Sequence, residues 1–174
     1  MESNQIVKVL QAAVKKGDPF AHGALAFMYF NGKEVEKDEK KSNDLLIKGA
    51  ALGDPECQFT LGCQYFGGRR GFAQDEAKAY DLFTKAVAQG HIKAAHNLAL
   101  CFDQGRGVDQ DFTRAAEMYY KAAENGVAES MFGLGVCYEK GRGMLADTQK
   151  ARDWYKKAAD KGLDAAVKKL ETLG

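Results

Sequence analysis

Three histidines are the residues best suited to chemistry in this chain, but their spacing fits no reactive site. They are His22, His91 and His96, and the last two stand five residues apart. Residues on one face of a helix are three or four apart, so these two side chains point to different faces and form no metal pair. No Cys-x-x-Cys motif is present, and no serine or cysteine has a histidine and an acid at a spacing that favours nucleophilic catalysis. The sequence therefore predicts no catalytic residue, no metal and no cofactor.

Three glycine-rich turns, residues 68–71, 105–107 and 141–143, have the composition of phosphate-binding loops. A phosphate loop follows a strand, whereas each of these turns follows a segment of helical spacing and recurs at a fixed interval. We therefore interpret them as helix ends followed by turns. Arg69 and Arg70 form a local basic pair in the first turn, which is either solvated or in contact with an acidic partner.

The elements that position these residues are copies of one helix–turn–helix unit, seen most clearly in residues 90–125. Glycines open successive copies at intervals of 36, 37, 36 and 36 residues. Fixed self-similarity at this period is typical of a solenoid. The opening glycines are Gly17, Gly53, Gly90, Gly126 and Gly162, and the aspartates expected to cap each second helix are Asp38, Asp75, Asp111 and Asp147.

The last full copy, AESMFGLGVCYEKGRGMLADTQKARDWYKKAADKG over residues 128–162, resembles the Sel-one-like repeat (SLR) family, a relative of the tetratricopeptide repeats. The resemblance extends over the whole chain. It implies an all-α fold, a right-handed α-solenoid superhelix of antiparallel helix pairs with about ten helices. We expect one solenoid domain over residues 1–174, with full repeats over 17–52, 53–89, 90–125 and 126–161. Half-repeat caps are expected over 4–16, with a polar outer face, and over 162–174.

The first full repeat departs most from the pattern. Glu34 replaces the second glycine of its turn, and Ser42 and Gly49 stand where alanine is usual. A glycine inside a helix costs about 1 kcal/mol relative to alanine, so we expect this repeat to be the least regular. The second repeat has one extra residue in its turn, GGRRGFAQD, which a loop bulge would absorb.

Composition narrows the class of partner and the compartment. The net charge is +1, which argues against general nucleic-acid binding, and no apolar run approaches the ~18 residues of a membrane span. The N-terminus lacks the pattern of a signal peptide. The four cysteines all fall in first helices, without mates in second helices, so we expect free thiols in a reducing, cytoplasmic setting. They are Cys57, Cys63, Cys101 and Cys137.

Helical periodicity separates two faces of each first helix. At 100° per residue, the face with Leu25 and Tyr29 must pack against the second helix. The opposite face would line a concave groove if the geometry of tetratricopeptide arrays carries over. Its predicted partner-binding residues are aromatic in the first half and charged in the second: Phe20, Phe27, Phe30, Phe59, Phe66, Lys93, His96, Asp103, Glu129, Phe132 and Glu139.

Some of these rings could instead fill gaps between stacked helices, and this alternative is strongest for Phe27 and Phe59 in mid-helix. Phe20, Phe30 and Phe66 lie near helix ends and are expected to be more exposed. Gly23, on the same face, could admit a ligand or let two helices approach.

The resemblance implies a protein- or peptide-binding adaptor or scaffold rather than an enzyme, in a monomer or weak oligomer. One alternative is β-lactam hydrolysis or another activity of the family's cysteine-rich branch, although paired cysteines about eight residues apart are missing here. Another is an immunity or regulatory protein that occludes a cognate effector.

Overall fold

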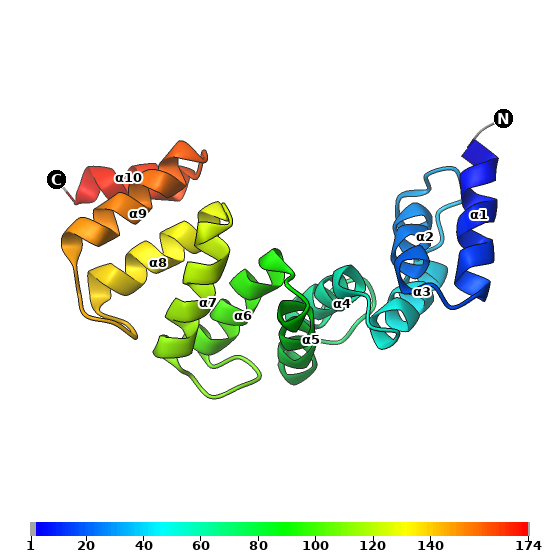
Figure 1. The fold of residues 1–174 in the computed structure, drawn as a ribbon, viewed down its shortest axis with the longest axis horizontal. Helices are drawn as coiled ribbons and strands as arrows, with labels where there is room; N and C mark the ends of the chain where they lie inside the picture. The colour runs from blue at the N-terminus through cyan, green and yellow to red at the C-terminus, as the bar shows by residue number, and fades with distance from the viewer. Residues whose placement is uncertain (1–2, 174) are drawn as a thin grey trace. The chain divides into compact units, whose positions relative to one another are not determined.

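A computed structural model describes residues 3–173, and these residues form helices joined by turns (Figure 1). This described part contains ten helices and no strand, which confirms the predicted all-α class and helix number. The helices are α1 (Ser3–Lys15), α2 (Pro19–Asn31), α3 (Glu39–Ala51), α4 (Pro55–Gly67), α5 (Glu76–Ala88), α6 (Ile92–Gln104), α7 (Phe112–Glu124), α8 (Ala128–Lys140), α9 (Thr148–Asp160) and α10 (Asp164–Thr172).

Local signals in the sequence explain where these helices begin and end. Asp18 caps α2 by accepting a hydrogen bond from the backbone N–H of Ala21 at 3.2 Å, and Pro19 occupies the first turn. Asp147 caps α9 in the same way, with 2.9 Å between its Oδ1 and the backbone nitrogen of Lys150. Left-handed glycines follow the ends of the first helices, as the repeated turns predict: Gly32, Gly68, Gly105 and Gly141.

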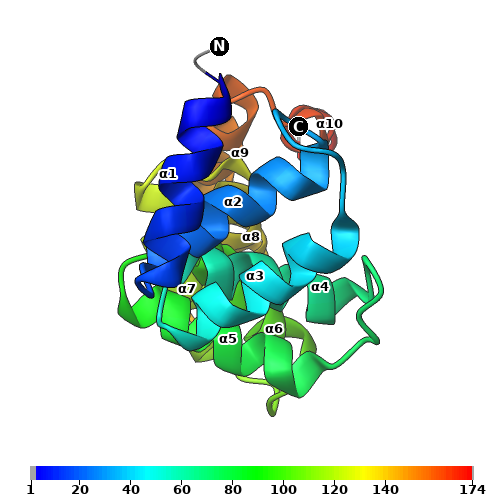
Figure 2. The same ribbon diagram turned by 90° about the vertical axis from the view of Figure 1, so that its right-hand side faces the viewer.

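The described residues fall into two compact units, one up to His91 and one from Ile92 onward. In the first unit α2 packs on α3 and α4 on α5, while α1 lies beside α2 and α3 contacts α4 (Figure 2). Its core contains two clusters of buried residues. One is Val7, Leu25 and Met28, and the other is Ala26, Leu46, Ala50, Cys57 and Leu61.

The second unit repeats this arrangement with α6 on α7, α7 on α8, α8 on α9 and α9 on α10. Small residues let its helices approach one another closely. An added Cβ at Gly135 would come within 2.6 Å of the Tyr155 ring, so glycine is required where α8 meets α9. No helix within residues 3–173 is long and apolar enough to cross a membrane.

Two expectations about the N-terminal elements need correction. The exposed surface of α1 is not uniformly polar, because Ile6 and Val9 are 54% and 58% exposed. Gly49 is not simply a weak point in α3, because an added Cβ there would lie 2.5 Å from the Sγ of Cys57 on α4. The glycine therefore makes room for the cysteine, and the cost in helix propensity accompanies a specific helix contact.

Candidate functional site

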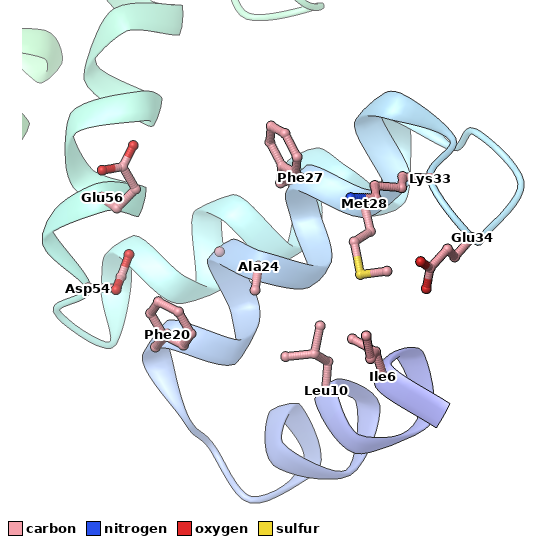
Figure 3. Close-up of a pocket in the computed structure, with 11 residues that line it drawn as sticks. Ile6, Leu10, Phe20, Ala24, Phe27, Met28, Lys33, Glu34, Asp54 and Glu56 are labelled. Atoms are coloured by element: carbon pink, nitrogen blue, oxygen red, sulfur yellow. The ribbon is translucent and has the colours of Figure 1, made fainter. Parts of the chain in front are cut away.

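An apolar recess with a volume of about 390 Å³ lies in the first unit. We call it the first hollow. Its size falls within the roughly 300–1,000 Å³ range of clefts that bind ligands. Figure 3 shows Ile6 and Leu10 of α1 facing Met28 of α2, with Phe20 near the start of α2 and the Phe27 ring directed away from α1. The lining residues are Ile6, Leu10, Phe20, Gly23, Ala24, Phe27, Met28, Lys33, Glu34, Asp54 and Glu56.

The hollow exists where a ring is missing from the repeat pattern. Gly23 occupies the position that Phe59, His96 and Phe132 occupy in the following repeats. Each of those rings packs within its own unit. Phe59 stacks on His91 with ring centroids 4.5 Å apart, and Phe132 lies 5.2 Å from the Tyr155 ring. At Gly23 the ring is absent, and Phe20 and Phe27 of the same helix are exposed.

Two positions that neighbour Gly23, namely Gly49 and Cys57, also differ from the equivalent positions of the later repeats. The Sγ of Cys57 lies 3.0 Å from where a Cβ of Gly23 would stand, and 2.5 Å from where a Cβ of Gly49 would stand. In the later repeats the three positions hold a ring and two small residues. These sets are Phe59 with Ala86 and Ala94, His96 with Ala122 and Ser130, and Phe132 with Ala158 and Ala166. The Cys57 thiol therefore lies where the Cβ atoms of a ring residue at position 23 and of an alanine at position 49 would crowd it.

A second hollow, of about 400 Å³, adjoins the first and shares Gly23, Phe27 and Glu56 with it. Phe30 and Arg70 line its far side. The guanidinium carbon of Arg70 lies 3.4 Å from the Phe30 ring centroid, a cation–π contact that covers the ring.

Backbone strain is concentrated beside the two hollows. Among residues 3–173, two residues other than glycine have a positive φ: Glu34 at 63° and Arg70 at 55°. Both stand where the later repeats have Gly107 and Gly143, whose φ values are 74° and 71°. This backbone conformation costs an L residue about 1–2 kcal/mol, so each side chain is retained against a local penalty. Glu34 lines the first hollow and Arg70 lines the second.

Acidic groups predominate at the edge of the first hollow. Asp54 and Glu56 extend from the start of α4 on one side, and Lys33 and Glu34 lie beyond α2 on the other (Figure 3). Asp54 is buried, and its carboxylate accepts a 2.6 Å hydrogen bond from the backbone N–H of Cys57. The Glu56 side chain is 70% exposed and lies 3.1 Å from Nε2 of His91. Three carboxylates and one lysine therefore surround an apolar floor.

The structure divides the predicted aromatic residues of the first unit into two groups. Phe20 is 72% exposed, as expected for a residue near a helix end, and Phe27 is 64% exposed although it lies in mid-helix. Phe30, Phe59 and Phe66 are half-buried. The expected exposure of Phe30 and Phe66 is wrong, because Arg70 covers the first ring and Phe83 packs 5.9 Å from the second.

The predicted residues of the second unit enter ion pairs and packing contacts. Arg142 lies 3.3 Å from Oδ1 of Asp103. Glu139 accepts hydrogen bonds from Tyr155 at 2.6 Å and Lys169 at 2.8 Å, and these bonds lower its pKa. His96 and Phe132 are half-buried and contact Ser130 and Tyr155 respectively, whereas Lys93 and Glu129 are exposed.

The potentially reactive groups are placed as structural residues. Cys57, Cys101 and Cys137 are buried and Cys63 is half-buried, all with free thiols. Burial raises the pKa of Cys57, and it raises the pKa of Cys137 to about 11, so neither thiol is activated as a nucleophile. Within the described residues, no group of three or more His, Cys, Asp or Glu side chains could hold a metal ion.

Sequence reasoning missed the contribution of α1 to the site. Ile6 and Leu10 were assigned to a cap, but they form one wall of the first hollow (Figure 3). Their spacing of four residues marks one helix face and could have been recognised. Lys33 and Glu34 could also have been found, since Glu34 replaces a glycine of the repeat.

Comparison with known proteins identifies four copies of one repeat along the chain. The family model for the Sel1 repeat matches residues 19–54, 55–91, 92–127 and 128–163. The uncharacterized protein NMB1327 of Neisseria meningitidis serogroup B is 32% identical over 97 residues, which is 55% of this chain and 20% of that protein.

Two solved structures match more of the chain. One is c5321, described as a protective antigen present in uropathogenic Escherichia coli strains and displaying an SLR fold. It is 31% identical with a TM-score of 0.84, over 92% of this chain and 34% of its own. The other is a Sel1 repeat protein from Oxalobacter formigenes, 30% identical with a TM-score of 0.84, over 99% of this chain and 49% of its own. The chain spans half or less of the length of each relative named here.

Proposed function

This chain belongs to the Sel1 repeat family, and we propose that it is a protein-binding adaptor whose partner docks on the first unit at the first hollow. Sel1 repeats are generally helical scaffolds typical of protein interaction. We propose that this chain likewise binds without catalysing a reaction.

The observation that carries the proposal is the gap at Gly23. Phe20, Phe27 and Ile6 are all exposed in the lining of this hollow, and large apolar side chains grouped on a surface commonly mark a binding site. Aromatic residues in such recesses often supply most of an interface's binding energy. The later repeats have Phe59, His96 and Phe132 at the equivalent position, so the missing ring is particular to the first repeat.

The experiment fills the hollow with the protein's own repeat pattern. The triple variant Gly23→Phe/Gly49→Ala/Cys57→Ala reproduces the set Phe59, Ala86 and Ala94. The double variant Gly49→Ala/Cys57→Ala is the matched control, because it makes the same exchange of core volume without adding the ring. Both variants should fold, as judged by circular dichroism and thermal melting. The exchange at positions 49 and 57 nearly conserves core volume, and the added ring of the triple variant enters an open hollow.

Affinity capture from a cell extract, followed by mass spectrometry, compares the wild type with both variants. A docking partner should be retained by the wild type and the double variant and lost from the triple variant. An identical set of bound proteins on all three would show that the first hollow is not the docking site.

A further inference from the structure

We infer that the first hollow selects a peptide segment with a large apolar side chain flanked by lysine or arginine. The inference rests on the proposed function and names the chemistry of the partner at that site. The apolar floor would hold the anchor side chain, and Glu34 and Glu56 would bind the basic groups at opposite sides of the hollow (Figure 3).

The apolar half of the specificity follows from the lining. Ile6, Leu10, Phe20, Phe27 and Met28 supply side chains without hydrogen-bonding groups. A polar side chain placed on this floor would lose its hydrogen bonds to water without gaining partners, whereas an apolar one gains from leaving water. Leucine, isoleucine, methionine or phenylalanine is therefore the expected anchor.

The charged half follows from the carboxylates that are still accessible. Asp54 is buried and caps α4, so its carboxylate already accepts a hydrogen bond from the backbone N–H of Cys57. The Glu56 side chain is exposed beside Nε2 of His91, so its carboxylate can also accept an ammonium or guanidinium group. Lys33 offsets one carboxylate, and the sum of the four charged residues remains negative.

Glu34 provides an independent reason to assign a role to charge. It has a φ of 63° at a position where Gly107 and Gly143 stand in other repeats. Glycine would relieve the strain, so the sequence keeps a carboxylate at the hollow against its own backbone preference. Strained residues of this kind cluster at ligand-binding sites.

The first test uses a phage-displayed library of random linear peptides selected on the immobilised wild-type chain. Selected peptides should share Leu, Ile, Met or Phe with Lys or Arg within a few residues, and they should bind less tightly in added salt because exposed charges are screened. They should also bind the double variant Gly49→Ala/Cys57→Ala and fail to bind the triple variant.

The second test measures the affinity of one selected synthetic peptide by fluorescence anisotropy. Glu56→Gln and Glu34→Gln should each raise Kd by about two- to fivefold, as expected for solvent-exposed ion pairs. Glu36→Gln is the matched control, since Glu36 is an exposed carboxylate two residues from Glu34 that does not line the hollow. Glu34→Gly should weaken binding while raising Tm, a combination that a purely structural role would not produce.

The outcomes separate this inference from the proposed function. Peptides that lose binding to the triple variant but lack basic residues, or ignore both Gln substitutions, would overturn the charge assignment and leave the docking site in place. Peptides that bind the triple variant as tightly as the wild type would contradict both. Selection of acidic peptides would also overturn the inference.

Discussion

A single side chain, His96, shows how one position of the repeat can serve packing instead of binding. Its Nδ1 lies 2.8 Å from Oγ of Ser130, which is fully buried, and its ring lies 6.0 Å from that of Tyr119. The sequence predicted that His96 lies on a groove face, but in the structure its polar partner is Ser130 of α8, the first helix of the following repeat. Periodicity assigns a direction to a side chain and does not reveal which neighbour it meets.

Stability of the second unit should decrease as the pH falls, because His96 is held neutral. Burial lowers the pKa of His96, and the charge of Glu129 opposes this effect only partly. The unfolded chain, with a histidine pKa of about 6.5, therefore binds the proton more readily. The free energy of unfolding should begin to decrease as the pH falls below that value, and the loss should be complete below the pKa of the folded state.

Urea titrations followed by circular dichroism test this expectation. They measure the free energy of unfolding at pH values from about 7.5 to about 4.5, above and below the ordinary histidine pKa. The double variant His96→Phe/Ser130→Ala, which has the residue types of Phe132 and Ala166, should lose this part of the acid dependence. Lys93→Gln, an exposed substitution on the same helix, should retain it. An unchanged profile in the double variant would assign the pH dependence to other groups.

At the scale of the helix, boundaries were the most predictable feature because caps are local. The predicted aspartate caps are in place, each with its Oδ1 2.9–3.0 Å from the backbone nitrogen three residues later. The contribution of α1 was less predictable, because Ile6 and Leu10 line the first hollow together with residues of α2 and of the start of α4. The environment of such a side chain depends on contacts between helices. These contacts require residues of complementary volume, such as Gly49 of α3 and Cys57 of α4.

Removing one cap should destabilise the second unit by about 1 kcal/mol. We expect this of Asp147→Ala, because the substitution leaves the N–H of Lys150 without its side-chain acceptor at the start of α9. Asp147→Asn and Asp147→Ser should recover most of the loss, since both side chains can accept the same hydrogen bond. Asp109→Ala, an exposed acid in the turn before α7, is the control and should have little effect. Urea unfolding measures the difference, and equal stability of Asp147→Ala and the control would show that the cap is dispensable.

At the scale of the whole chain, the repeat period identified the family fold and the helix order without any contact information. It could do so because each repeat of a solenoid buries a hydrophobic face against its neighbour, so matched columns reflect physical constraints. The candidate site could be predicted only in part, since Phe20 and Phe27 belong to the predicted face but the recess arises from a departure at Gly23. The regular repeat period therefore predicts the helical scaffold, whereas the candidate site lies at the first repeat, where the sequence departs from that period's residue pattern.

An array with contacts between consecutive helices should respond locally when its last helix is removed. Lys169 of α10 donates a 2.8 Å hydrogen bond to Glu139, which also accepts one from the buried Tyr155. Deleting residues 163–174 removes this lysine and uncovers the apolar face of α9 that α10 packs on. Hydrogen exchange measured by mass spectrometry should therefore become faster in α8 and α9 and stay unchanged in α2 to α5.

Lys168→Ala, at an exposed position of α10, should leave exchange unchanged in both units. Uniformly faster exchange across all helices would show that the chain unfolds as one cooperative block, and unchanged exchange in α9 would show that α10 does not act as a cap.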